Sequence, residues 1–99
     1  MSSDVFLGLP YNIASYAILT HLLARATGLR AGELIISLGD AHIYKNHIEQ
    51  VKQIIARTPP AMPTLKIETA NVDIDNYKIT DFSLEGYTHL GVVKGDIAV

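Results

Sequence analysis

Residues 12–28 read Asn-Ile-Ala-Ser-Tyr-Ala-Ile-Leu-Thr-His-Leu-Leu-Ala-Arg-Ala-Thr-Gly, and this stretch decides the fold class. Asn12 is a typical helix N-cap and Gly28 is typical of the position just past a helix end, so a helix is predicted between them. Few side chains between residues 13 and 26 are polar, and nearly every face of this helix is therefore apolar. Such a helix is a central one, surrounded by the rest of a protein.

Shorter apolar segments on either side of this helix predict strands. Residues 5–9 form an apolar run that ends at Pro10, and residues 33–44 are apolar in their first half and alternate in their second. Residues 64–68 and 78–84 predict two more strands, with a turn or short helix over 73–77 between them.

A second helix is predicted from Asn46, because Glu49 completes a capping box and the apolar residues that follow form one stripe that covers a sheet. The proline-rich residues 58–63 predict an extended linker, and residues 85–99 lack periodicity. The fold class is therefore α/β (α+β), with strands packed on one buried central helix. We expect residues 1–99 to be part of one domain with no internal boundary, because these few elements cannot cover the helix alone.

Composition excludes several classes of function. The chain has 99 residues, a net charge of −2, no basic cluster and no cysteine. Binding to DNA by a positive face, disulfides, thiolate metal sites and a cysteine nucleophile are thus excluded. No apolar run approaches the ~20 residues of a membrane span, and the first residues do not resemble a signal peptide, which predicts a cytoplasmic protein that binds no membrane.

Two local patterns point to binding chemistry. Asp40, His42 and Tyr44 alternate along the predicted strand, so they share one face, and the imidazole and the phenol can converge on one hydroxyl group. The alternative is a polar trio on a half-solvated strand end. Asn12 offers a donor and an acceptor that suit the edge of a pyrimidine, and its alternative is a plain N-cap.

Other kinds of site have little support. A metal site would have to use His21, His42, His47 and His89, which lack the spacing of ligand pairs, so we predict no metal. Ser2, Ser3 and Ser15 have no histidine or carboxylate partners nearby in sequence that would make a hydrolase triad. A glycine-rich phosphate loop is also missing.

Four segments together resemble thymidylate synthase. Residues 4–17 (Asp-Val-Phe-Leu-Gly-Leu-Pro-Tyr-Asn-Ile-Ala-Ser-Tyr-Ala) and 39–47 (Gly-Asp-Ala-His-Ile-Tyr-Lys-Asn-His) are similar to two signatures of that family. Residues 82–87 and 97–99 are similar to its later and terminal motifs. The order and spacing fit the last third or so of a full-length member.

The resemblance implies an activity and a set of contacts. The family methylates deoxyuridylate (dUMP) reductively to thymidylate (dTMP), with 5,10-methylenetetrahydrofolate as co-substrate. The resemblance implies that Asn12 binds the uracil edge and that His42 and Tyr44 hold the 3′-hydroxyl of the deoxyribose. The implied substrate-binding residues are Ser2, Ser3, Asp4, Asn12, Ser15, His42 and Tyr44. Those implied on the folate side are Asp4, Leu7, Gly8, Tyr11 and Ala98, of which Ala98 closes over the pterin.

The chain departs from the family pattern in its chemistry. The family's nucleophile is a cysteine, which is absent here, so no catalytic residue is assigned. Its phosphate-binding arginines are absent too, and Met1 stands where one of them would precede Ser2. We therefore expect an inactive carboxy-terminal portion of a synthase that needs a missing N-terminal synthase portion or works as a homo-oligomer. The alternative is a non-catalytic dimerisation or regulatory module. A relative specific for dCMP is disfavoured, because an aspartate in place of Asn12 would suit cytosine better.

Overall fold

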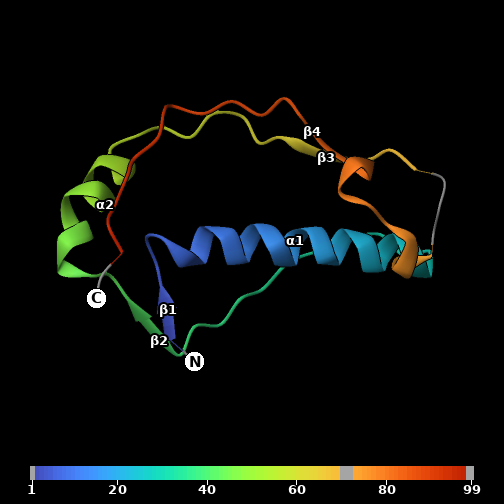
Figure 1. Cartoon of the computed structure of the whole chain (residues 1–99), viewed down its shortest axis with the longest axis horizontal. Helices are drawn as coiled ribbons and strands as arrows, with labels where there is room; N and C mark the ends of the chain where they lie inside the picture. Colours follow the sequence, from blue (N-terminus) through green and yellow to red (C-terminus); the bar gives the residue numbers. More distant parts are fainter. Residues whose placement is uncertain (1, 70–72, 98–99) are drawn as a thin grey trace. The chain divides into compact units, whose positions relative to one another are not determined.

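A computed structural model describes residues 2–69 and 73–97 (Figure 1). The elements in chain order are strand β1 (Ser2–Asp4), helix α1 (Gly8–Thr27), strand β2 (Asp40–His42), helix α2 (Ile48–Ile55), strand β3 (Thr64–Ile67) and strand β4 (Phe82–Glu85). Three short 3-10 turns accompany them: η1 (Lys45–His47), η2 (Ile74–Asn76) and η3 (Ile79–Asp81). A mixed α/β chain of two helices and small sheets is thereby confirmed.

The contacts of the chain divide it into two units. The first unit contains Met1–Ala14, Ile35–Pro59 and His89–Val99, and the second contains Ser15–Leu34 and Pro60–Thr88. In the first unit, β1 and β2 pair in parallel, and Ser3, Phe6 and His47 are its buried residues among those described. In the second unit, β3 and β4 pair antiparallel, and no described residue is buried.

Helix α1 ends as predicted but begins earlier. Gly28 has a φ of +72°, Leu29 N donates to the Ala24 carbonyl at 2.8 Å, and Gly28 N donates to the Arg25 carbonyl at 3.4 Å. These two bonds and the left-handed glycine form a Schellman motif, which terminates the helix.

The predictions of a strand over residues 5–9 and of Asn12 as N-cap were wrong. Helix α1 already begins at Gly8, so Asn12 lies inside it. Pro10 does not prevent this, because the N–H groups of the first helical turn have no intrahelical acceptor and proline lacks only that group.

The long predicted strand over residues 33–44 is mostly absent. Only Asp40–His42 is a strand, and residues 29–38 have no regular structure. Leu34, Ile35 and Ile36 are all exposed, Ile35 to 81%. A strand requires a neighbour for its backbone hydrogen bonds, and no described segment pairs with residues 33–38. The apolar sequence is present without its partner.

The later elements follow the sequence more closely. Strand β3 and the 3-10 turn η2 lie where a strand and a short helix are predicted, and residues 58–63 have no regular structure. The predicted strand 78–84 was partly wrong, since η3 occupies its first half and Lys78 N donates to Asp81 Oδ2 at 2.8 Å. The capping box of the second helix was also wrong: α2 has His47 as N-cap, without a side-chain bond.

Both helices expose apolar faces. No residue of α1 or α2 is buried, Tyr11 is 78% exposed and Ile55 is 75% exposed. The prediction that strands pack on one buried central helix was therefore wrong for the described residues, in which the elements present do not cover α1. The prediction that the apolar stripe of α2 covers a sheet was wrong for the described residues, where Ile48 and Ile54 are exposed as well.

Candidate functional site

The parallel pairing of β1 and β2 brings two of the predicted site segments together. The register places Ser2 beside Asp40, Ser3 beside Ala41 and Asp4 beside His42. Val5 N donates to the His42 carbonyl at 3.0 Å and extends the ladder by one bond. Because parallel partners lie about 5 Å apart, Asp4 and His42 are direct neighbours across the two strands.

The carboxylate of Asp4 shapes the chain between β1 and α1. Its Oδ1 accepts hydrogen bonds from Phe6 N at 3.1 Å and Leu7 N at 3.2 Å. Aspartate commonly makes such a turn, in which its side chain replaces a backbone acceptor. Asp4 therefore fixes where α1 begins, at Gly8, and in which direction residues 7–12 leave the strand.

His42 and Tyr44 form an edge-to-face ring pair. Their ring centroids lie 4.9 Å apart at an interplanar angle of 85°. His42 Nδ1 lies 3.1 Å from the Asp40 carbonyl oxygen, which can only accept, so Nδ1 carries the proton of this bond. In the neutral tautomer the other ring nitrogen, Nε2, is then an acceptor. The His42 side chain is 28% exposed and Tyr44 is 41% exposed, so a ligand can reach both.

A second aromatic contact connects this pair to the core of the first unit. The ring of His47 lies 5.9 Å from that of Tyr44 and 4.9 Å from that of Phe6. His47 is fully buried, and its Nε2 lies 2.6 Å from the Asp96 carbonyl oxygen. The sequence pattern indicates His47 only as a weak metal ligand and does not predict this role. Its spacing of three residues from Tyr44, at the start of a helix, was the available signal.

The remaining predicted residues lie in several places. Tyr11 and Asn12 are exposed on the first turns of α1, Leu7 and Gly8 are half-buried, and Ser2 is exposed. The described structure contains no hydrogen bond from the Asn12 side chain to β2 or to Tyr44. Ser3 is buried, and its Oγ has no hydrogen-bond partner in the described part of the chain. Ser15 belongs to the second unit, and Ala98 is outside the described residues.

The described residues contain neither a cluster of metal ligands nor a membrane-spanning helix. Among residues 2–69 and 73–97, no three His, Asp or Glu side chains lie close enough to hold a metal ion. None of the described helices is long and apolar enough to cross a membrane. The second unit contains a shallow, open pocket of about 350 Å³, and none of the predicted site residues lines it.

Polar side chains gathered where strands end in a mixed α/β chain are typical of enzymes that act on small molecules. Residues 1–99 match the thymidylate synthase family, and the chain belongs to this family. Thymidylate synthases of Listeria innocua and Listeria monocytogenes are each 51% identical to it over 98 residues, and that of Francisella tularensis is 52% identical. These matches cover 99% of this chain but only 31% of the Listeria enzymes and 36% of the Francisella enzyme. The chain thus spans about a third of the length of these relatives.

Proposed function

We propose that this chain is a carboxy-terminal portion of a thymidylate synthase and supplies the sugar and base contacts of its deoxyuridylate site. The complete site would methylate dUMP to dTMP with 5,10-methylenetetrahydrofolate as co-substrate. The proposal rests on the pair of His42 and Tyr44 beside Asp4, in a chain that matches this family along its whole length.

The hydrogen-bonding pattern of the ring pair suits one hydroxyl group. His42 Nδ1–H is engaged by the Asp40 carbonyl, which leaves Nε2 as an acceptor. A sugar 3′-hydroxyl can donate to His42 Nε2 and accept from the Tyr44 hydroxyl at the same time, because a hydroxyl is both donor and acceptor. A deoxynucleotide is therefore bound by its sugar in a defined orientation, and its base is directed by the same contact.

The other residues complete the proposed site. Asn12 distinguishes uracil from cytosine through the donor and acceptor of its amide. Ser2 and Ser3 belong to the nucleotide side, and Leu7, Gly8, Tyr11 and Ala98 to the folate side. Asp4 Oδ1 holds the turn before α1, so this carboxylate acts on both ligands chiefly by placing residues 7–12.

The chemistry of methyl transfer requires residues that these 99 do not contain. A thiolate that adds to the pyrimidine ring must come from other sequence, since the chain has no cysteine. We propose that the nucleophile and the arginines that bind the phosphate lie in a further synthase portion or in a partner chain.

A nucleotide titration followed by NMR tests this proposal. Deoxyuridylate should shift the resonances of Asp4, Asn12, His42 and Tyr44, and deoxyadenylate, with the same sugar and charge, should shift those of Asn12 less. His42→Gln should weaken the response, and the control His21→Gln, on an exposed histidine of α1, should not. Shifts spread evenly over the chain, or equal effects of the two variants, would contradict the proposal.

A second candidate function is a non-catalytic module for dimerisation or regulation of a synthase. The exposed apolar side chains favour it, because a single chain that shows so much apolar surface tends to associate. Examples are Tyr11 at 78%, Tyr16 at 56% and Leu29 at 70% exposure. Sedimentation of the pure chain combined with the nucleotide titration distinguishes the two functions: an assembly module forms a defined dimer and does not bind deoxyuridylate.

A further inference from the structure

The pocket of the second unit lies beside the last turns of α1. Its volume of about 350 Å³ falls within the range of small-molecule sites, about 300–1,000 Å³. His21, Ala24 and Arg25 form one wall, and they share a face of α1 because they are three and four residues apart. Leu29 lines the pocket as well, because the helix ends at the left-handed Gly28 and the chain changes direction there.

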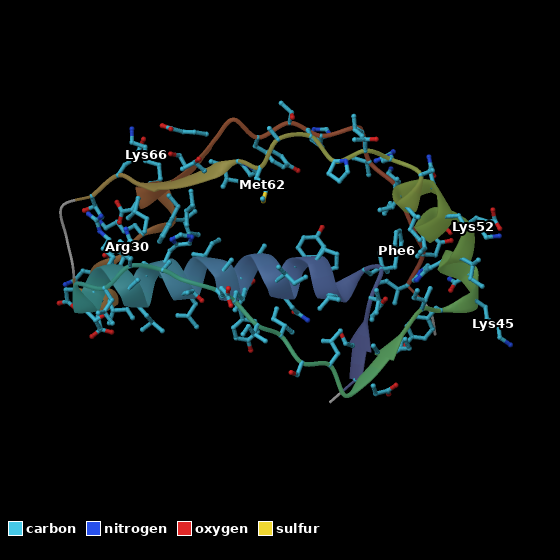
Figure 2. All side chains as sticks on the ribbon, turned by 180° about the vertical axis from the view of Figure 1, so that it is seen from behind. Phe6, Arg30, Lys45, Lys52, Met62 and Lys66 are labelled. Atoms are coloured by element: carbon cyan, nitrogen blue, oxygen red, sulfur yellow. The ribbon has the colours of Figure 1, made fainter. Side chains whose placement is uncertain are left out.

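A second wall of the pocket belongs to strand β3 and is apolar. Leu65 and Ile67 line the pocket, whereas Lys66 between them lies on the other face of the strand, away from α1 (Figure 2). Lys66 Nζ lies 3.4 Å from Glu85 Oε1 and 3.9 Å from Glu68 Oε1. These charged side chains therefore pair with one another on the outer face, and none of the described residues that line the pocket is acidic.

The guanidinium of Arg25 is held in place at this pocket. Its Nη2 donates a hydrogen bond to the Thr69 carbonyl, which is 44 positions away in sequence. Its Nε is buried and has no hydrogen-bond partner in the described part of the chain. A guanidinium has five N–H groups, and a buried donor without an acceptor is unfavourable. The protein thus orients Arg25 and leaves donors that an acceptor in the pocket would satisfy.

We propose that this pocket binds a small organic acid, in which a carboxylate is joined to an apolar body. Arg25 supplies the full positive charge among the described residues that line the pocket, and carboxylates bind a guanidinium through two parallel hydrogen bonds. The side chains of Leu29, Leu65 and Ile67 would cover the apolar body, which an inorganic anion lacks. The pocket is separate from the candidate nucleotide site, because none of the residues assigned to that site lines it.

An NMR titration of the unsubstituted chain with three probes tests the chemistry of the ligand. The compound 3-phenylpropionate has both the carboxylate and the apolar body, 3-phenylpropanol has the body alone, and inorganic phosphate has the negative charge alone. The acid should shift the resonances of Arg25, Leu65 and Ile67. It should bind about tenfold more tightly than either other probe, the lower end of the range for a bond to a charged group, because the pocket is open to solvent.

Two arginine variants test the assignment to Arg25. Arg25→Gln should weaken binding of 3-phenylpropionate about tenfold and should affect 3-phenylpropanol much less, because the substitution removes the charge. The matched control is Arg30→Gln, which removes the same charge from an exposed arginine that does not line the pocket, and it should leave binding of the acid unchanged.

The outcomes that would overturn the proposal are distinct. Equal affinity for 3-phenylpropionate and 3-phenylpropanol would show that no charge is recognised, and phosphate that binds as tightly as the acid would show that no apolar body is. Equal effects of the two arginine variants would remove Arg25 from the site. Because Arg25 also holds Thr69, the resonances of β3 and β4 verify the fold of Arg25→Gln. If that variant loses the hairpin, the comparison of the three probes on the unsubstituted chain decides the matter.

Discussion

Replacing Tyr44 by phenylalanine should weaken deoxyuridylate binding by removing one of two hydrogen bonds to the sugar. The ring, and with it the contacts to His42 and His47, is kept. Because Tyr44 is 41% exposed, its hydroxyl competes with water, and the lower half of the usual range applies, about 0.5–1 kcal/mol. This corresponds to about a two- to fivefold loss of affinity, starting from a Kd of about 1 mM for a site held by a few neutral bonds.

The assay is an NMR titration of the chain and of Tyr44→Phe with deoxyuridylate and with its 2′,3′-dideoxy analogue. The analogue lacks the 3′-hydroxyl, so the substitution should not change its affinity, and the double comparison isolates the single bond. Tyr16→Phe, at an exposed tyrosine of α1, is the matched control. An equal loss for both nucleotides would refute the assignment, since Tyr44 would then act on something other than the 3′-hydroxyl.

Four further outcomes follow from the same reasoning. The 99-residue chain alone should show no thymidylate synthesis from deoxyuridylate and methylenetetrahydrofolate, because a thiolate is absent; turnover by pure protein that resists thiol reagents would contradict this. Asn12→Asp should shift preference toward deoxycytidylate, measured by competitive titration, and an unchanged ratio would remove Asn12 from the base contact. The chain should self-associate at micromolar concentration because of its exposed apolar faces, and a cooperative monomer in sedimentation would disprove it. Gly28→Ala should lower the free energy of unfolding by about 1 kcal/mol, because φ is +72° there; unchanged denaturation followed at 222 nm would speak against the Schellman motif.

Local sequence signals were sufficient to predict the features that are formed by residues close together in sequence. The end of α1 at Gly28 was predictable because the motif uses only neighbouring residues. Strand alternation predicted that Asp40, His42 and Tyr44 share one face. The structure shows the rings of His42 and Tyr44 in edge-to-face contact, and the ligand of this pair stays a prediction. Residue types and short spacings in the sequence are enough to predict where a helix ends and which side chains share a strand face.

Features that depend on distant partners were not predictable in the same way. The apolar residues 33–38 indicated a strand, but a strand exists only where a neighbour accepts its hydrogen bonds, and the described residues contain none. The role of His47 depends on Phe6 and Asp96, which are far apart in sequence, so its spacing of three residues from Tyr44 indicated only the contact with that ring. The family resemblance, in contrast, was confirmed because it uses the whole sequence at once.

The parallel pairing of β1 with β2 has a consequence for the order of folding. Helix α1 needs only local contacts and can form within about a microsecond, whereas β1 must find β2 across the helix and a long irregular segment. The bond between His47 and Asp96 then closes a second loop, because these residues are 49 positions apart in sequence. The ring pair of His42 and Tyr44 should therefore become ordered late, in a slow phase that ring resonances reveal after helix formation is complete. Until then a refolding chain is helical but has no nucleotide site, so recovery of helicity and recovery of ligand binding should occur at different rates.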